Sequence, residues 1–297
     1  MINSFKINKK LSFIIFVFSL ICFIFFNISA DFTYIIPICF FLIMTFGISH
    51  GSLDHLKGYK VLQFYKIKNK FIFYLIYIIF SLIIIFCWLA LPFFMLILFL
   101  TVASYHFGKE DSEFGKMQKR RFTNFYFLLK GSIIILAPIL ANPEETIKIF
   151  EILDVQIKPF ENNIILMLIG LSLMSNFFIN KNVAVSLMDS FSVILLNLTF
   201  SPLIAFTIYF CFLHSIRHSI SLIFELNNKN FTKGFKDFIK KALPLTLITA
   251  IIFLISVYFL TNFYILDEAI LKVVFIGLAS LTFPHILLEY IMEKNEK

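Results

Sequence analysis

The chain has 297 residues, of which 60% are hydrophobic and only 15% are charged, and its mean hydropathy is +0.90. Soluble domains are about half apolar and about a quarter charged. A soluble fold, an intrinsically disordered chain and a secreted disulfide scaffold are therefore excluded, and the solvent of this chain is lipid. The net charge of +8 does not indicate a nucleic-acid partner, because 21 of the 26 lysines and arginines lie in segments predicted to share one side of the membrane.

Apolar stretches long enough to cross a bilayer, which takes about 20 helical residues, occupy most of the sequence. In chain order they are residues 11–30, 33–52, 71–89, 92–107, 125–141, 163–180, 183–200, 203–226, 243–262 and 268–291. An open sheet cannot satisfy its backbone in lipid, so these stretches predict helices. We predict an all-α, polytopic transmembrane helix bundle of about ten spans, with a range of eight to ten. We expect a single integral-membrane domain over residues 1–297, with 11–30 as an additional N-terminal span and 33–291 as the main bundle.

Basic residues mark alternate connections between these spans. They cluster before the first span, in residues 53–70, 108–124 and 227–242, and in the C-terminal tail, whereas the connection 142–162 is acidic. Because cytoplasmic connections carry the excess of Lys and Arg, both termini are predicted to be cytoplasmic. We expect a multi-pass protein of the cell membrane, inner or plasma.

Five of the six histidines fall in one leaflet of this topology, and only His55 is predicted to lie in a loop. The five are His50, His106, His214, His218 and His285, on four predicted spans. His214 and His218 are four residues apart and so share a helix face, which is the spacing by which one helix offers two imidazoles to a metal ion. Ionisable residues inside a membrane are functional by default, and neutral imidazole is a common metal ligand. The joint pattern therefore predicts a metal site, although hydrogen-bonded interhelical histidines are the structural alternative.

Three other polar residues allow two interpretations each. Asp54 and Asp111 follow His50 and His106, and either orient the second ring nitrogen of a metal-bound histidine or are solvated acids at the interface. Arg217 lies near mid-membrane, where an unpaired charge is costly, so we expect a structural role, with either Asp189 or Glu225 as its partner or with the side chain snorkelling to the cytoplasm. A role in supporting the metal site or in contacting the substrate is the functional alternative.

Four motifs, taken together and in this order, resemble one known family. They are HGSLDH at residues 50–55, SYHFGKED at 104–111, HSIRH at 214–218 and PHILLEY at 284–290. They resemble the motifs of the Brp/Blh family of membrane-embedded beta-carotene 15,15'-dioxygenases, from about Gly47 to Glu289.

The resemblance implies a non-haem Fe(2+) cofactor on four histidines, which motif by motif are His50, His106, His214 and His218, and no other cofactor. His285 stays outside this metal set, as a contact to the substrate or a support for the site, and 33–291 becomes the catalytic bundle. The reaction it implies is cleavage of the central double bond of beta-carotene by dioxygen to two molecules of all-trans retinal, commonly supplied to a rhodopsin. An electron-rich polyene could supply the electrons that such a reaction needs, and it shares the bilayer with the protein.

Two other classes of histidine-rich membrane metalloprotein remain as alternatives. A lipid desaturase or hydroxylase with a di-iron centre needs about eight histidines and an HxxHH cluster, which this sequence lacks. A metal or proton transporter predicts histidines or acids through the whole depth of the membrane, and here the outer leaflet is almost bare of them.

Overall fold

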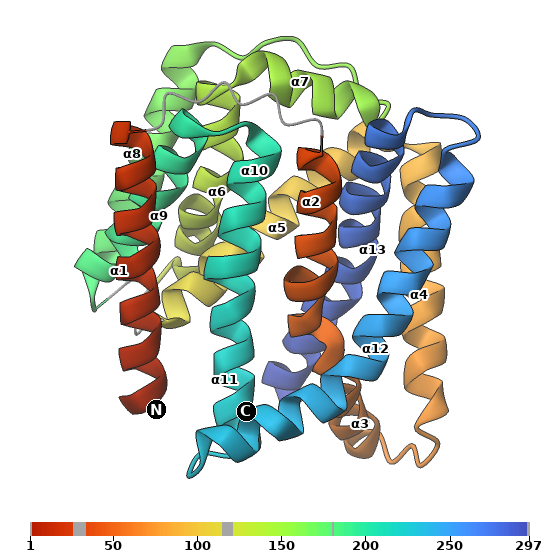
Figure 1. Cartoon of the computed structure of the whole chain (residues 1–297). Coiled ribbons are helices and arrows are strands. Elements are labelled where there is room, and N and C mark those ends of the chain that lie inside the picture. Colours follow the sequence, from red (N-terminus) through yellow and green to blue (C-terminus); the bar gives the residue numbers. More distant parts are fainter. Residues whose placement is uncertain (1, 26–33, 115–120, 180, 296–297) are drawn as a thin grey trace.

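The computed structural model describes residues 2–25, 34–114, 121–179 and 181–295, with the backbone alone at residues 2–4, 50, 114 and 179. Throughout these residues the regular structure is helical, as the sequence predicts (Figure 1). The helices are α1 (Ile2–Phe25), α2 (Ile35–Leu42), η1 (Ile43–Gly47), η2 (Ile48–Leu53), α3 (Asp54–Phe64), α4 (Phe71–Ala90), α5 (Pro92–Phe114), α6 (Thr123–Ala141), α7 (Pro143–Ile152), α8 (Asn162–Ile179), α9 (Val183–Thr199), α10 (Pro202–Ile208), η3 (Tyr209–Ser215), α11 (Ile216–Leu226), α12 (Phe231–Leu260) and α13 (Leu266–Asn295).

The predicted apolar stretches become the long helices of a bundle. In the described part of the chain, eight continuous helical segments are long and apolar enough to cross a membrane. Two of them are composite, because α2 runs through η1 and η2 into α3, and α10 runs through η3 into α11. The sixth and seventh predicted spans form the shorter apolar helices Asn162–Phe178 and Val183–Thr199. The fold class is confirmed, and the eight candidate spans in the described residues match the lower end of the predicted range.

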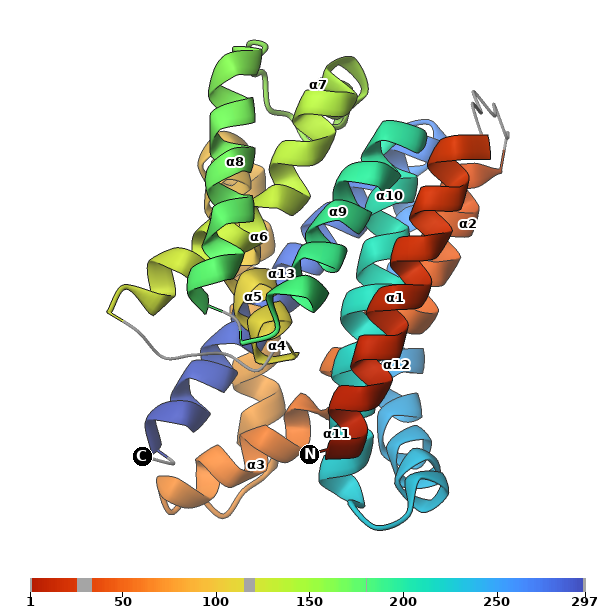
Figure 2. The same ribbon diagram turned by 90° about the vertical axis from the view of Figure 1, so that its left-hand side faces the viewer.

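The two ends of the bundle differ in what covers them. The N- and C-terminal ends of the chain lie at the same end of the bundle, and α7 lies across the opposite end (Figure 1). We refer to these as the terminal end and the α7 end. Helix α3 also lies at the terminal end (Figure 2).

Three segments that the sequence analysis treated as connections contain helix. Residues 53–70 hold α3, residues 142–162 hold α7, and 231–242 form the first part of α12. Helix α7 begins with a proline, and it carries Glu144 and Glu145 in its first turn, which favours the helix dipole. Helix α12 begins where the Asn230 side chain accepts a hydrogen bond from the backbone N–H of Lys233.

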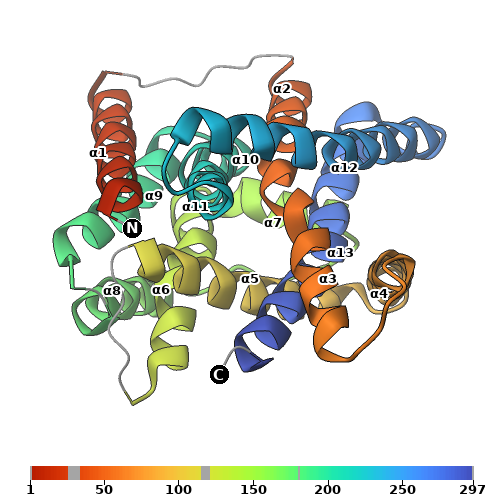
Figure 3. The same cartoon turned by 90° about the horizontal axis from the view of Figure 1, so that it is seen from below.

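The first part of α12 crosses the terminal end of the bundle before the helix turns toward the α7 end (Figures 1 and 3). Pro244 lies inside this helix. A proline removes one backbone hydrogen bond and clashes with the preceding turn, so it bends a helix without ending the apolar run. The basic connection predicted from the sequence is thus helical over residues 231–242.

Helices α5 and α6 approach closely at a pair of glycines. A Cβ atom added to Gly108 would lie 1.9 Å from the carbonyl oxygen of Phe127, and one added to Gly131 would lie 1.8 Å from that of Ser104. Both positions therefore require glycine. The contact holds the part of α5 that follows His106 rigidly against α6.

Two π-helical turns face each other beside the histidines. They are η1, which ends at Gly47, and η3, which contains His214. The Ser215 hydroxyl donates to the carbonyl oxygen of Gly47 at 3.3 Å, and a Cβ on Gly47 would meet the Phe210 ring at 2.6 Å. A π turn inserts one residue into a helix and re-aims the side chains that follow, which is why such turns are frequent at functional sites.

Candidate metal centre

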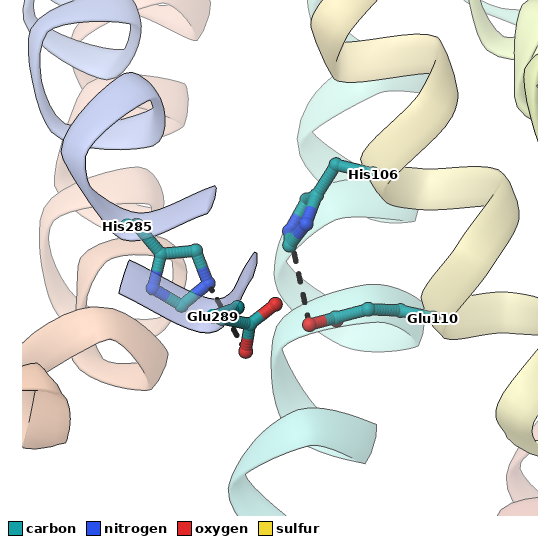
Figure 4. A group of neighbouring side chains, drawn as sticks. All are labelled: His106, Glu110, His285 and Glu289. Carbon is teal, nitrogen blue, oxygen red and sulfur yellow. Dashed lines mark ion pairs between the residues drawn. The ribbon is translucent and has the colours of Figure 1, made fainter. Parts of the chain in front are cut away.

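Two histidines and two glutamates from α5 and α13 point toward one another in the membrane-spanning part of the bundle (Figure 4). His106 and Glu110 come from α5, and His285 and Glu289 come from α13. One nitrogen or oxygen atom of each side chain lies within 4.8 Å of those of the other three. In both pairs the residues are four positions apart, so each helix presents an imidazole and a carboxylate on one face.

Two further histidines, from the composite helix η3–α11, complete the cluster around Glu110. His218 Nδ1 lies 3.0 Å and His214 Nε2 lies 3.4 Å from the Glu110 carboxylate, and His106 Nε2 lies 3.8 Å from it. The His106 ring is 5.4 Å from the His214 ring and 5.3 Å from the His285 ring, measured between centroids. We call the set His106, Glu110, His214, His218, His285 and Glu289 the histidine–glutamate cluster.

The structure thus brings together three of the four histidines that the resemblance assigns to the metal. His106, His214 and His218 surround one carboxylate, as described above. His50 lies in η2, directly after the π turn of η1, and its side chain lies outside the described residues. His285, which the sequence analysis kept outside the metal set, is part of the cluster.

Asp54 is a buried partner of His285. His285 Nδ1 lies 2.9 Å from each carboxylate oxygen of Asp54, and the Tyr77 hydroxyl donates to Asp54 at 3.1 Å. Only 4% of the Asp54 surface is exposed, so the interpretation of Asp54 as a solvated acid is wrong. A carboxylate in this position fixes the tautomer and the orientation of an imidazole ring.

Arg217, Asp111 and Asp189 form another buried group, the Arg217 cluster, beside the histidine–glutamate cluster. Arg217 makes a bidentate ion pair with Asp189, at 2.8 and 2.5 Å. Of the two partners predicted for Arg217, Asp189 is therefore the one found. Asp111 lies 3.7 Å from Arg217 and accepts a hydrogen bond of 2.8 Å from Tyr209. Arg217 also donates to Ser12, which ties α1 to the bundle. Asp111 is 6% exposed, so its interpretation as a solvated acid is also wrong.

His55 is helical and not in a loop. It is the second residue of α3, and its Nδ1 atom lies 2.9 Å from the carbonyl oxygen of Ser52. The predicted span ends at residue 52, whereas the helix continues through η2 and α3 to Phe64.

The sequence analysis missed Glu110 and Glu289. A signal for them was present, because His106 and His285 are each followed four residues later by a glutamate. The same spacing drew attention to His214 and His218.

A large apolar cavity opens beside the cluster. It has a volume of about 800 Å³ and is lined by His106, His214 and His285 on one side, and mainly by aromatic and aliphatic side chains elsewhere. Three of its lining residues, Ile78 and Leu89 on α4 and Phe259 on α12, are 56%, 67% and 61% exposed. The cavity therefore reaches the apolar outer surface of the bundle between α4 and α12.

The cluster fits a transition-metal ion. Imidazole suits iron, copper and zinc, and sites of histidine with carboxylate bind non-haem ferrous iron. Glu110 is 5% exposed and has three imidazoles around it, and a buried carboxylate requires a compensating positive charge. A divalent cation held by the surrounding imidazoles would supply that charge.

The fold and the cluster define a polytopic membrane protein with a buried histidine–carboxylate site that opens on an apolar cavity. The chain matches the sequence model of the beta-carotene 15,15'-dioxygenase family over residues 41–293. It is 30% identical over 256 residues to the beta-carotene 15,15'-dioxygenase of uncultured marine bacterium 66A03, which covers 83% of this chain and 90% of that protein. The chain therefore belongs to this family of carotenoid dioxygenases. No solved structure is significantly similar to it.

Proposed function

We propose that this protein cleaves the central double bond of beta-carotene with dioxygen and releases two molecules of all-trans retinal. In this reaction the carbon–carbon double bond and the O–O bond break, and one oxygen atom goes to each new aldehyde. The polyene itself supplies all the electrons, so no external reductant is needed. The observation that carries the proposal is the apolar cavity that joins the lipid-facing surface to the histidine–glutamate cluster in a chain of this family.

We further propose Fe(2+) as the cofactor, with His50, His106, His214 and His218 as its ligands. Three of these side chains converge on Glu110, which supports the set. When bound, a ferrous ion supplies the centre at which dioxygen is activated. Glu110 balances the positive charge of such a centre from within the protein.

The remaining residues of the site position these groups and exclude water. Asp54 holds the His285 ring through Nδ1, and Lys57 holds Glu289 through an ion pair of 2.8 Å. Phe107 packs edge-on against His214, with ring centroids 4.6 Å apart. Aromatic walls of this kind bind a flat, rigid hydrocarbon without polar anchors.

The setting of the reaction follows from the substrate and the charge distribution. Beta-carotene dissolves in the bilayer, and the gap between α4 and α12 offers it a direct path to the cavity. The basic connections support a cell-membrane protein whose terminal end is cytoplasmic. Retinal is the chromophore of rhodopsins, so we propose that the product is supplied to one. Family membership favours this activity over a lipid desaturase or a transporter.

The direct test is expression of the full chain in a bacterium that accumulates beta-carotene, under ample iron and oxygen. We expect the orange colour to fade while retinal appears in extracts. A variant of the exposed turn before α13, Phe263→Ala, should bleach the cells equally and controls for expression. Cells that stay orange although the protein is folded in the membrane would refute the proposal.

A further inference from the structure

The cavity has one end at the cluster and another at an isolated pair of charges. Along α13, Lys272 and His285 both line the cavity and are 13 residues apart, which is about 20 Å at 1.5 Å per residue. Apart from the histidines, the charged residues in the described lining are Asp54 near the cluster, and Lys272 and Asp154 toward the α7 end. The wall between these two polar regions is largely hydrocarbon.

Lys272 is held firmly although it lies against an apolar cavity. Its ammonium group lies 2.6 Å from the Asp154 carboxylate and 4.6 Å from the centroid of the Tyr264 ring. Only 6% of the Lys272 side chain is exposed, whereas 61% of that of Asp154 is exposed. The lysine therefore reaches from inside the bundle to a partner at its surface, and its stem and ammonium group close this end of the cavity.

Asp154 is placed for this contact by the segment that covers the α7 end. It follows α7 and has a φ of 64°, a left-handed conformation that aspartate tolerates better than most residues. On either side of it Leu153 and Val155 are 0% and 1% exposed. The carboxylate that fixes Lys272 thus projects from a turn whose neighbours are anchored in the core.

We propose that the Lys272 side chain, fixed by Asp154 and Tyr264, is the stop against which one end ring of the carotenoid rests. A hydrocarbon ring cannot displace the ion pair, because it offers the two charges no replacement partner. The rigid polyene then extends from the ring to the cluster, and the depth of the cavity decides which double bond lies at the histidines. The position of cleavage is set about 20 Å from the site of chemistry. This inference rests on the proposed function.

The test replaces Lys272 and measures which bond is cleaved in an asymmetric substrate, an apocarotenal with a single end ring. Lys272→Ala deepens the cavity, so the ring moves away from the cluster and the cleaved bond moves further along the chain. We expect the ring-bearing aldehyde from Lys272→Ala to be longer than retinal by about one or two double bonds. Lys272→Met keeps nearly the full side-chain length but loses the ion pair with Asp154, so its product should lengthen less than that of Lys272→Ala.

Controls separate this inference from the proposed function and from misfolding. Lys148→Ala removes an exposed lysine of α7 that does not line the cavity, and it should leave the product unchanged. If Lys272→Ala does not fold, Tyr264→Ala opens the same end and should lengthen the product in the same way. Retinal as the sole ring-bearing product of a folded Lys272→Ala or Tyr264→Ala protein would overturn the inference, as would equal shifts in Lys272→Met and Lys272→Ala. A wild-type chain that cleaves no carotenoid would instead refute the proposed function.

Discussion

Two buried polar clusters lie side by side in this bundle, and they use neighbouring residues of α5. Glu110 faces the imidazoles of His106, His214 and His218, whereas Asp111 faces Arg217 and Tyr209. The two acids are adjacent in sequence and almost equally buried. They differ in their partners, which are imidazoles for Glu110, and a guanidinium and a phenol for Asp111.

The difference shows how function and structure divide the polar residues of a membrane protein. In the Arg217 cluster a permanent cation, Arg217, lies beside the carboxylates of Asp189 and Asp111. The histidine–glutamate cluster brings together imidazole nitrogens and carboxylate oxygens, which are metal-binding atoms. Lys57 forms an ion pair with one of its carboxylates, that of Glu289. Lone pairs converging without a matching permanent cation are the arrangement that a metal ion completes. We therefore propose that the Arg217 cluster stabilises the fold and that the histidine–glutamate cluster binds the cofactor.

The largest expected effect follows from removing a histidine of the histidine–glutamate cluster. We expect His214→Ala and His218→Ala each to lower retinal formation by at least about 10³-fold, as loss of an essential group does in other enzymes. Bound iron, measured by elemental analysis of the purified protein, should be lost with it. If either variant kept nearly wild-type iron content and activity, that histidine would have a structural role and would not be a metal ligand.

Breaking the Arg217 cluster should lower the free energy of unfolding. Arg217→Met leaves Asp189 and Asp111 buried without their cation, which costs about 3–5 kcal/mol. Unfolding in detergent measures this loss, and the double variant Arg217→Met with Asp189→Leu should recover part of it. The fraction that remains folded should bind iron as the wild type does. Loss of iron from folded Arg217→Met protein would contradict the division between the two clusters.

Glu110 and Asp111 are adjacent on α5, so removing the charge of one or the other compares the two clusters most directly. Glu110→Gln should weaken iron binding by about 10- to 100-fold, the usual effect of a group that supports a metal site. Asp111→Asn removes the same charge one residue further along, and we expect it to lower the unfolding temperature while iron affinity is kept. Iron titration and thermal unfolding of both purified variants separate the two outcomes. Identical behaviour of the two variants would show that the clusters act as one.

The smallest effect is expected where α1 contacts the Arg217 cluster, at Ser12. Ser12→Ala removes a hydrogen bond to the charged Arg217 side chain, worth about 1.5 kcal/mol. Ser19 is a matched control on the same helix, because it is equally buried and its described bond is to the carbonyl oxygen of Ile15. Ser19→Ala should therefore destabilise the protein less than Ser12→Ala does in unfolding measurements. Equal losses would indicate that α1 packs against the bundle without using this bond.

The sequence predicts the parts of this molecule that depend on composition and spacing. Runs of Phe, Ile and Leu predict helices because lipid leaves the backbone no other partner. The cost of an isolated charge in lipid predicts a partner for Arg217, and Asp189 is found there. The helical spacing of His214 and His218 places both on one side of their helix, and the structure brings both to Glu110.

Other features depend on how the helices pack, which spacing alone does not reveal. Whether Glu110 faces a histidine or Arg217 is decided by the rotation of α5 against α6, and the Gly108–Gly131 contact sets that rotation. The π turns of η1 and η3 shift the register of the residues that follow them, and they leave no pattern in apolar periodicity. The polar stop at Lys272 required Asp154, from a segment predicted only as an acidic connection.

The stoichiometry of the purified protein tests the central claim most directly. Wild-type protein in detergent would be stripped of metal with a chelator, reloaded with Fe(2+) or with Zn(2+), and given beta-carotene in oxygenated buffer. We predict two retinal molecules formed and one dioxygen consumed for each beta-carotene with Fe(2+), and no turnover with Zn(2+) or without metal. Full activity in the metal-free protein, or products other than retinal from the iron-loaded protein, would contradict an iron-dependent central cleavage at this cluster.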